Sequence, residues 1–549
     1  MRFHIFLVAL LATLPAAFLS ATVFASTPAS EEKPFVIIVQ PIIVQGDDGT
    51  DPASMALPED LVDRAYDKAN IDFYFLEPLH YNNSAARDGE INLDQIVLQA
   101  KQDGMLRGQG DIVNMFFVNA VDGQKGPLGR GMFNGDLTFI TLGKDGDSPA
   151  QKAMQAFVIA HEVGHNLGLP HAVDDPSVPD DLPNIQGDGA YEDRIDPRHS
   201  LTPSQIEKIM QSPLVHPRVD LLSRADGQEA ILDESFEPYF SKLQKREIEA
   251  FVAETAPDGS LESIRDFARQ KFTSAVLGFT PKEKQALVWL TQEVRRELTK
   301  HNIGLMAGHP WRFIKVDSWL CGGFAHTRGT YIILSQHHMD SLRTRWSGEM
   351  TKEAREALLK GFGALLVHEQ MHSLQRSFPE KFARLNQTSW GFHKAHVEPE
   401  EYITLNQVSN PDAPQAEWLI PDPGKDNQYY WIRTLLKPTD AVPRMGKDFA
   451  DQVFTVTLKD NKYRVKKDRN SVPKSFPVTD FSWFTDQFPV SRGIDHPNEI
   501  AAYMFAEKFK TRIGDSPPEK SPSPQKYRQK MESFTLWVTR EMIPRAGLE

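Results

Sequence analysis

The sequence predicts an α+β / α/β protein with two domains in tandem, each built around a helix that carries the motif H-E-x-x-H. Three observations support this fold class. The chain of 549 residues is long enough for roughly two to four domains. Strand-like and helix-like segments alternate over residues 36–167. The motif itself occurs twice, at residues 161–165 and 368–372, each time within an apolar helical stretch.

The first 25 residues have the pattern of a secretory signal peptide. Arg2 is their only charged residue, an apolar run follows, and Val23-Phe24-Ala25 offers small residues for cleavage after Ala25. An uncleaved membrane anchor is the alternative, because the run is nearly long enough to span a bilayer. Pro15 and the cleavage-like end favour the signal peptide. We therefore expect an exported protein (secreted, periplasmic or at the cell surface) with no stable membrane span after signal removal.

Composition narrows the class of protein further. Hydrophobic residues make up 40% and charged residues 25% of the chain, which is ordinary for a globular protein and excludes a disordered or collagen-like one. The net charge of −13 predicts no nucleic-acid partner. Cys321 is the only cysteine, so no intrachain disulfide can form. We expect it to be a buried, small apolar residue; a catalytic thiol is the alternative.

The N-terminal segments follow the order β-α-β-α-β-β-α. The expected strands are 36–45, 71–79, 111–121 and 137–143, and the expected helices are 57–70, 92–102 and 149–167. This alternation predicts a mostly parallel sheet with helices packed on it. Residues 172–200 are polar and rich in Asp and Pro, which predicts a long loop. Thr202 and Pro203 then have the types favoured at the start of a helix.

The first domain is predicted to span residues 26–225, and residues 213–235 read as a connector. A helix-rich second domain is predicted for residues 236–549. Its expected helices are 239–254, 259–275, 281–300, 352–376, 497–510 and 526–542, with strands near 312–317 and 330–335. Residues 378–490 are mixed and rich in aromatics. Residues 515–525 are rich in Pro and Ser and are expected to be a flexible excursion.

The first motif lies in the sequence AFVIAHEVGHNLGLPH. On a helix, His161 and His165 share one face and can bind one zinc ion, with Glu162 placed to take a proton from metal-bound water. Gly168 can end the helix in a left-handed conformation, so that the chain returns His171 as a third ligand. Three protein ligands leave one coordination position open, as in catalytic zinc sites. A helix that merely carries histidines on its surface is the alternative.

This extended motif resembles that of the metzincin metallopeptidases, over about residues 35–215. The resemblance implies a zincin-like domain, in which a mixed sheet packs on the active-site helix. It also implies zinc held by His161, His165 and His171, with Glu162 as general base. One departure is that metzincins place a methionine turn beneath the zinc. The corresponding loop here is formed by residues 183–187, and it contains no methionine.

The second motif lies in GALLVHEQMHSLQR, where no glycine or third histidine follows. A third ligand must come from elsewhere, and the best candidate is Glu499 in HPNEIAAYMFAEKF. This E-x-x-A pattern resembles the glutamate helix of the gluzincin peptidases, over about residues 300–510. The resemblance implies His368, His372 and Glu499 as zinc ligands and Glu369 as base. The competing third ligands are Glu507, Glu398, Glu400 and Glu401, and Glu499 could instead be an ordinary glutamate at a helix start.

Two features near the second motif remain open. Residues 325–332 have the pattern of an edge strand that could pair with an extended substrate, or of a core strand with a turn at Gly329. A side chain that stabilises the transition state is not identified by the sequence. The candidates are Tyr429, Tyr430, His326 and Arg328, and for each of them a structural role is favoured.

The two motifs together lead us to expect an exported zinc-dependent metallopeptidase (a hydrolase). It would bind two Zn²⁺ ions, one per domain, and cleave a peptide or protein substrate. The alternative is a zinc-binding protein in which one or both peptidase-like domains are inactive and serve as a binding or structural module. The missing methionine turn and the uncertain third ligand of the second motif keep this alternative open.

Overall fold

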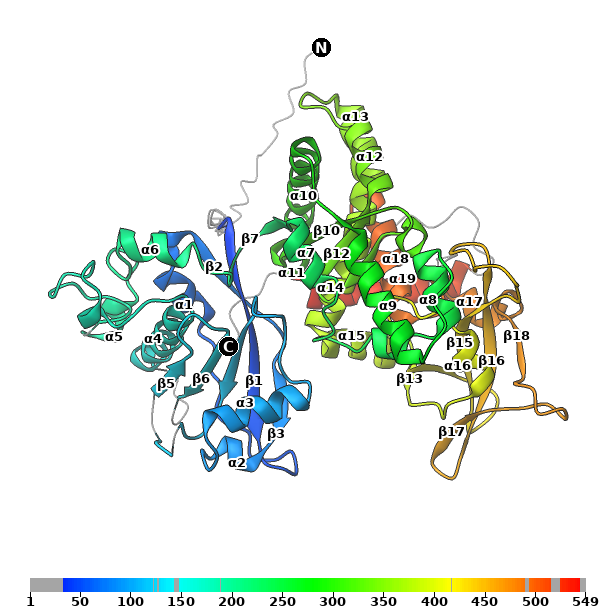
Figure 1. The fold of residues 1–549 in the computed structure, drawn as a ribbon, viewed down its shortest axis with the longest axis horizontal. Coiled ribbons are helices and arrows are strands. Elements are labelled where there is room, and N and C mark those ends of the chain that lie inside the picture. The colour runs from blue at the N-terminus through cyan, green and yellow to red at the C-terminus, as the bar shows by residue number, and fades with distance from the viewer. Residues whose placement is uncertain are drawn as a thin grey trace, which may run out of the picture.

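The computed structural model describes residues 33–121, 123–125, 128–142, 148–187, 189–415, 417–488, 493–514 and 524–543. The predicted signal peptide lies outside these residues, as does nearly all of the predicted excursion 515–525. We call residues 33–217 the N-terminal part and residues 219–543 the C-terminal part. They lie side by side in Figure 1, at the left and at the right respectively. No helix among the described residues is both long and apolar enough to cross a bilayer.

The N-terminal part is built on a seven-stranded, mostly parallel sheet in the order β2-β1-β4-β6-β5, with β3 and β7 also paired to β1. Its strands are β1 (Phe35–Gln45), β2 (Ile71–Phe75), β3 (Leu79–Asn82), β4 (Val113–Phe117), β5 (Leu128–Gly131), β6 (Leu137–Thr141) and β7 (Val215–Pro217). Strands β5 and β7 run antiparallel to their neighbours. The predicted parallel core is therefore present, whereas β5 and β7 were not predicted.

Helices cover both faces of this sheet. They are α1 (Glu59–Ala65), η1 (Asp67–Ala69), α2 (Ser84–Arg87), α3 (Leu93–Gln102), α4 (Pro149–Asn166), η2 (Ala172–Asp174), α5 (Tyr191–Arg194) and α6 (Pro203–Ile209). On one face of β1, Ile37 and Val39 join the apolar core formed with α1 and α4. On the other face, Ile42 and Val44 pack with α3. Ser148 and Thr202 each accept a hydrogen bond from the backbone of the first turn of α4 and α6, and the predicted cap at Thr202 is thereby present.

The C-terminal part begins with a five-stranded sheet in the order β11-β12-β10-β8, with β9 also paired to β10. Its strands are β8 (Val219–Leu221), β9 (Val276–Leu277), β10 (Trp311–Val316), β11 (His326–Arg328) and β12 (Tyr331–Ser335). The surrounding helices are α7 (Arg224–Ala230), η3 (Phe240–Lys242), α8 (Lys245–Val252), α9 (Leu261–Ala275), α10 (Pro281–Lys300), α11 (Gly304–Gly308), η4 (Leu320–Gly323) and α12 (Gln336–Arg345).

The predicted long helix 352–376 is a continuous helical segment made of α13 (Lys352–Leu358), a π-helical turn η5 (Leu359–Gly363) and α14 (Ala364–Ser377). Further helices follow it. They are α15 (Pro379–Arg384), η6 (Leu385–Ser389), α16 (Glu401–Asn406), η7 (Val478–Asp480), α17 (Ser482–Thr485), α18 (Pro497–Lys510) and α19 (Pro524–Glu541). Helix α14 packs along α18, with Ala502 fully buried between them. These two helices carry the second motif and its candidate third ligand.

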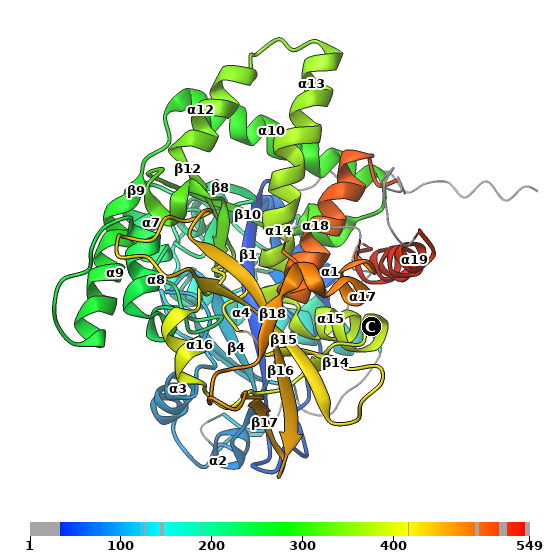
Figure 2. The same ribbon diagram turned by 90° about the vertical axis from the view of Figure 1, so that its right-hand side faces the viewer.

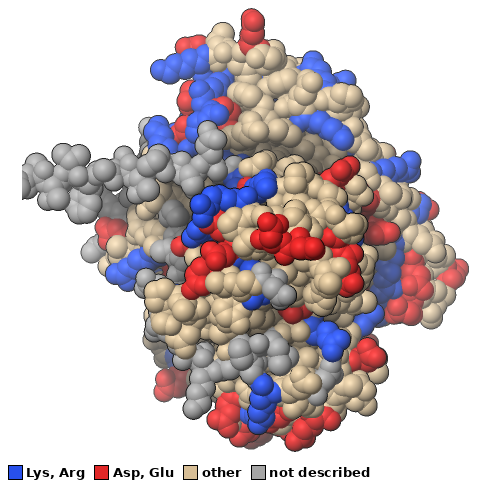
Figure 3. All heavy atoms as spheres, turned by 90° about the vertical axis from the view of Figure 1, so that its left-hand side faces the viewer, with Lys and Arg blue, Asp and Glu red and all other residues tan. Residues whose placement is uncertain are grey.

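The aromatic-rich region 378–490 contains a six-stranded sheet, in the order β13-β14-β15-β16-β17 with β18 on β16. All of its strand pairs are antiparallel. Its strands are β13 (His393–Lys394), β14 (Trp418–Pro421), β15 (Gln428–Leu436), β16 (Phe449–Lys459), β17 (Lys462–Val465) and β18 (Ser475–Pro477). Figure 2 shows this sheet at the front, projecting away from helices α8 and α9. Figure 3 shows the opposite side of the molecule, where acidic and basic side chains are intermingled.

The two parts share one apolar core. Val36 and Ile38 of β1, on the face that also carries Ile42 and Val44, belong to the same buried cluster as Leu287 of α10 and many other residues of the C-terminal part. Arg218 lies at the crossing between β7, which pairs with β1, and β8, which pairs with β10. The sheets therefore meet at a continuous, apolar seam.

A buried charge cluster reinforces this seam. The Asp111 carboxylate accepts hydrogen bonds from Arg312 Nη2 at 2.7 Å and from the Tyr331 hydroxyl at 2.5 Å, both in the C-terminal part. The backbone carbonyl of Asp111 contacts His216 Nε2 at 2.8 Å. Burial raises the pKa of Asp111, but Arg312 and Tyr331 outweigh burial and hold it below its usual range. The carboxylate is therefore charged and paired at neutral pH.

We predict that Asp111→Ala lowers the free energy of unfolding by about 3 kcal/mol, because it leaves the buried Arg312 guanidinium with only the more distant Asp220 carboxylate, at 3.9 Å. Tyr331→Phe removes one hydrogen bond to the same carboxylate and serves as the matched control, with an expected loss of about 1 kcal/mol. Chemical denaturation followed by circular dichroism measures both. Equal losses for the two variants would show that the ion pair does not hold the seam.

Candidate metal centres

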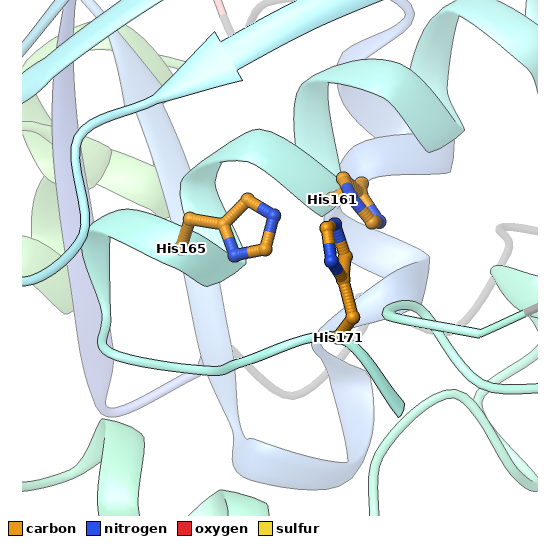
Figure 4. Close-up of side chains that lie close together, drawn as sticks. All are labelled: His161, His165 and His171. Carbon is orange, nitrogen blue, oxygen red and sulfur yellow. The ribbon is translucent and has the colours of Figure 1, made fainter. Parts of the chain in front are cut away.

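The structure brings three histidines of the first motif together. His161 and His165 lie four residues apart on α4, and His171 follows the turn at the end of this helix (Figure 4). Gly168 adopts a φ of +84°, which is the left-handed conformation expected of a glycine at a helix end. One ring nitrogen of each histidine lies within 4.8 Å of one nitrogen of each of the others. The three imidazoles thus face a common point.

Hydrogen bonds at the far side of two of these rings fix their orientation. His161 Nδ1 lies 2.8 Å from the Ile185 carbonyl oxygen, and His165 Nδ1 lies 2.7 Å from the Leu169 carbonyl oxygen. Since a carbonyl only accepts, each Nδ1 must carry the proton, which leaves the Nε2 lone pairs for a metal. Burial lowers the pKa of His161 to about 4 and also lowers the pKa of His165. These rings are therefore neutral at pH 7, the state that binds zinc.

The loop of residues 183–187, which contains no methionine, contacts His161. Ile185 is fully buried there, and its carbonyl contacts the His161 ring. Gln186 Nε2 donates a hydrogen bond of 2.7 Å to the His161 carbonyl oxygen. The backbone N–H of Gly187 donates to the Asn184 carbonyl oxygen, which closes the turn. The loop thus supports the ring without a thioether.

Glu162 lies next to β5, a strand that the sequence pattern did not predict. The Gly131 N–H donates a hydrogen bond of 2.6 Å to Glu162 Oε2. Gly129 and Gly131 face α4 so closely that a Cβ at either position would overlap Glu162. Burial raises the pKa of Glu162 to about 7, although the Gly131 N–H lowers it. A carboxylate with a raised pKa is a better acceptor of a proton from water.

The first centre is open to solvent on one side. His171 is exposed, and Val173, two residues later, is 91% exposed. Strand β5, which borders Glu162, is an edge strand of the sheet. An extended peptide could therefore approach the three imidazoles from this side.

The second motif forms a buried cluster with Glu499. His368 Nε2 and His372 Nε2 are 3.3 Å apart on α14, and each lies 3.5 Å from one oxygen of the Glu499 carboxylate. Glu499 sits in the first turn of α18, where Pro497 is the first helical residue. His372 Nδ1 contacts Gln375 Oε1 at 2.9 Å, which orients the ring. The structure thus brings these three predicted ligands together.

The competing glutamates lie elsewhere. Glu507 is half exposed and forms an ion pair with Lys510. Glu398 and Glu400 form ion pairs with Lys462 and Lys467, and Glu401 is exposed. None of the four belongs to a group of potential ligands among the described residues.

Both donor sets fit a zinc ion. The first offers three imidazoles, and the second offers two imidazoles and a carboxylate, which are combinations that zinc binds in proteins. In the second cluster the carboxyl groups of Glu369, Asp412 and Glu499 are all buried. Burial and then Asp412 raise the pKa of Glu369 well above its ordinary value. A divalent cation would stabilise these closely spaced, buried carboxyl groups.

A segment of the chain closes the second cluster. We call residues 408–414 the covering segment. Asn410 Nδ2 donates to Glu499 Oε1 at 2.7 Å, and Asp412 Oδ1 accepts the Thr327 backbone N–H at 2.6 Å. Arg376 Nη2 donates to the Pro411 carbonyl oxygen at 2.8 Å. Of the predicted edge strand 325–332, residues 326–328 form the edge strand β11, whereas 331–332 belong to the inner strand β12 after a turn at Gly329. The Thr327 N–H on β11 is already paired.

Three of the four sequence candidates for transition-state stabilisation lie in other environments, and Tyr429 among them packs against His393 and Tyr463. The fourth, His326, is buried and interacts electrostatically with Asp412 of the second cluster. The Tyr430 hydroxyl donates to Asp422 at 2.7 Å, and Arg328 lies over the Tyr239 ring. Two contacts that were not predicted from the sequence are nearer to the cluster. Thr327 Oγ1 lies 3.1 Å from Glu369 Oε2, and the Tyr503 ring centroid lies 4.4 Å from that of His368. The sequence did contain a signal for Tyr503, because its i, i+4 spacing from Glu499 puts both residues on one face of α18.

Comparisons with known proteins give weak likenesses among the solved structures. No protein-family model and no curated protein matches the sequence. Archaemetzincin from Methanopyrus kandleri aligns with a TM-score of 0.23 at 13% identity, over 32% of this chain and 94% of that chain. Metalloproteinase-II from Bacteroides fragilis aligns with a TM-score of 0.22 at 11% identity, over 34% of this chain and 55% of that chain. This chain thus spans only about half of the second protein.

We predict that Gly131→Ala lowers hydrolysis at the first centre by about tenfold or more, because the added methyl group forces β5 away from Glu162. Metal content at this centre should stay the same, since no ligand changes. Gly348→Ala is the control, because a Cβ there meets no atom within 4 Å. Initial cleavage rates and metal analysis of the three proteins test this. Wild-type activity of Gly131→Ala would contradict it.

Glu499→Ala should weaken zinc binding at the second centre by at least about tenfold, because one of three protein ligands is lost. Equilibrium dialysis against zinc buffers measures this affinity. The first centre should keep its zinc ion. At limiting zinc, the wild-type protein should therefore hold two zinc ions per chain and the variant should hold one. Glu507→Ala is the matched control on the same helix. If it lowers the zinc content and Glu499→Ala does not, the ligand assignment is wrong.

Proposed function

We propose that the chain is an exported zinc-dependent metallopeptidase that hydrolyses peptide bonds and carries two H-E-x-x-H sites. Residues 26–225 would form a metzincin-like domain and residues 236–549 a gluzincin-like one. The observation that carries the proposal is the convergence of His161, His165 and His171 beside Glu162. Support also comes from the exposure of His171, which leaves one side of the first centre open to a peptide substrate.

The residues of the first centre have separable roles in this proposal. His161, His165 and His171 would hold the zinc ion, which supplies a Lewis acid for the carbonyl oxygen and the attacking water. Glu162 accepts the proton of the attacking water and returns it to the leaving amine. The Gly131 N–H fixes the Glu162 carboxylate for this transfer. In the second site, His368, His372 and Glu499 would hold zinc, with Glu369 as base.

The closure of the second cluster favours a second candidate function for the C-terminal part. Glu369 is only 2% exposed, and the covering segment occupies both Glu499 and the edge of β11. A peptide cannot reach Glu369 while these contacts persist. In this alternative the C-terminal part is a zinc-binding module without turnover, and the first centre alone is catalytic.

We predict that Glu162→Gln lowers the cleavage of unfolded casein by about a hundredfold or more, because the general base is lost. Zinc content should remain at the wild-type value, since the ligands are unchanged. Cleavage of fluorescently labelled casein, together with metal analysis, measures both quantities.

Glu369→Gln is the matched variant for the second site. A fall in cleavage on its own would support two working centres. Wild-type cleavage would favour the zinc-binding module. If Glu162→Gln and the double variant both cleave at the wild-type rate, neither site is the source of the activity, and the proposed function fails.

A further inference from the structure

Residues 459–474 form a strongly basic pair of hairpins in an acidic protein. We call them the basic hairpins. They contain seven Lys or Arg residues and two Asp residues, a local charge of +5 in a chain whose net charge is −13. The seven are Lys459, Lys462, Arg464, Lys466, Lys467, Arg469 and Lys474, and all are exposed. The hairpins project from the body of the molecule near β17 (Figures 1 and 2).

The two hairpins have well-defined turns. Asp460 and Asn461 both have positive φ, as in the two-residue turn that joins two antiparallel strands tightly. In the next turn Asp468 Oδ1 accepts the backbone N–H groups of Asn470 and Val472 at 2.8 and 2.9 Å. The basic side chains are therefore held on a fixed backbone.

Strand alternation puts the basic side chains on one face. Val465 is buried, and Tyr463 packs inward against His393. Lys462, Arg464 and Lys466 alternate with these residues and point to the solvent side.

The arrangement of these charges does not favour the stability of the fold. Lys459 and Lys462 are directly opposite each other across β16 and β17, where like charges repel. Only Lys462 and Lys467 have ion-pair partners among the described residues, namely Glu398 and Glu400. The remaining basic side chains thus present uncompensated charge, which an anionic partner would neutralise.

An apolar side chain accompanies the charge. Val472, at the tip of the second turn, is 52% exposed. Tyr402 and Leu405 on α16 are also about half exposed, at 50% and 51%. The ion pair between Lys467 and Glu400, the N-cap of α16, holds this helix beside the hairpins. Exposed basic and apolar side chains on projecting turns are typical of proteins that lie on a bilayer surface.

We propose that the basic hairpins dock the protein on the surface of a bilayer that contains anionic phospholipid. The cations contact the lipid phosphates, and Val472 enters the interface between headgroups and acyl chains. A projecting pair of turns fits a flat surface, whereas single-stranded nucleic acid typically follows a basic groove lined with stacking platforms. The docking is independent of both metal centres.

The test uses the full mature chain and sedimentation with vesicles of phosphatidylcholine, either alone or with phosphatidylglycerol. The variant Lys459→Gln/Arg464→Gln/Lys466→Gln neutralises three cations of the basic hairpins. Its partition onto phosphatidylglycerol vesicles should fall by roughly a hundredfold, since each cation near such a surface contributes about a factor of five. The control Lys282→Gln/Lys352→Gln/Lys360→Gln removes the same charge from exposed helical positions and should bind as the wild type does.

Two further measurements separate a bilayer from a polyanion. Wild-type binding should fall as salt is added, because exposed charges are screened. Val472→Ser should weaken vesicle binding while the charge stays the same. Equal binding to both kinds of vesicle, or an equal loss in the control, would overturn the proposal. So would tighter binding to a single-stranded oligonucleotide with no effect of Val472→Ser. Casein cleavage in solution should stay unchanged in the three-residue variant, so this test and that of the peptidase function fail separately.

Discussion

The ion pair between Arg312 and Asp111 is the interaction on which the placement of the two sheets depends. A buried guanidinium group is strongly stabilised by a carboxylate partner. Here the carboxylate that lies nearest to Arg312 comes from the other part of the chain, and Asp220 of the same part lies 3.9 Å away. The shared apolar core then fixes β1 against α10. Helices α4 and α14, which carry the two motifs, are thereby attached to sheets that cannot slide past each other, and this rigidity favours well-defined centres.

The two centres differ because the chain takes a different path after each motif. Gly168 ends α4 one turn after His165, so the third donor arrives from a short loop and remains exposed. Helix α14 continues to Ser377, so the third donor must come from α18, which packs along it and buries the cluster. Glycine is also required at residues 129 and 131, because only residues without a side chain let β5 lie directly against Glu162.

Much of this arrangement could be predicted from local patterns. The helix cap at Thr202, the i, i+4 histidines and the helix of Glu499 depend on neighbours in sequence, and all were found where expected. Strand β5 was missed because its glycines serve a contact with α4 and carry no strand pattern. The sheet of residues 393–477 was left unassigned because its strands are irregular in length and partly buried on both faces. Thr327 and the covering segment reach the second cluster through tertiary contacts that no sequence spacing encodes.

The exposure of His171 has a consequence for the exchange of metal. One ligand at the solvent side can detach alone, so an ion in the first centre could leave in steps, each assisted by water. In the second centre His372 is fully buried, and Asn410 holds the carboxylate from the solvent side. Release there requires the covering segment to move first. A chelator would therefore strip the two centres on different timescales, and a half-loaded protein would be a kinetic species with its own lifetime.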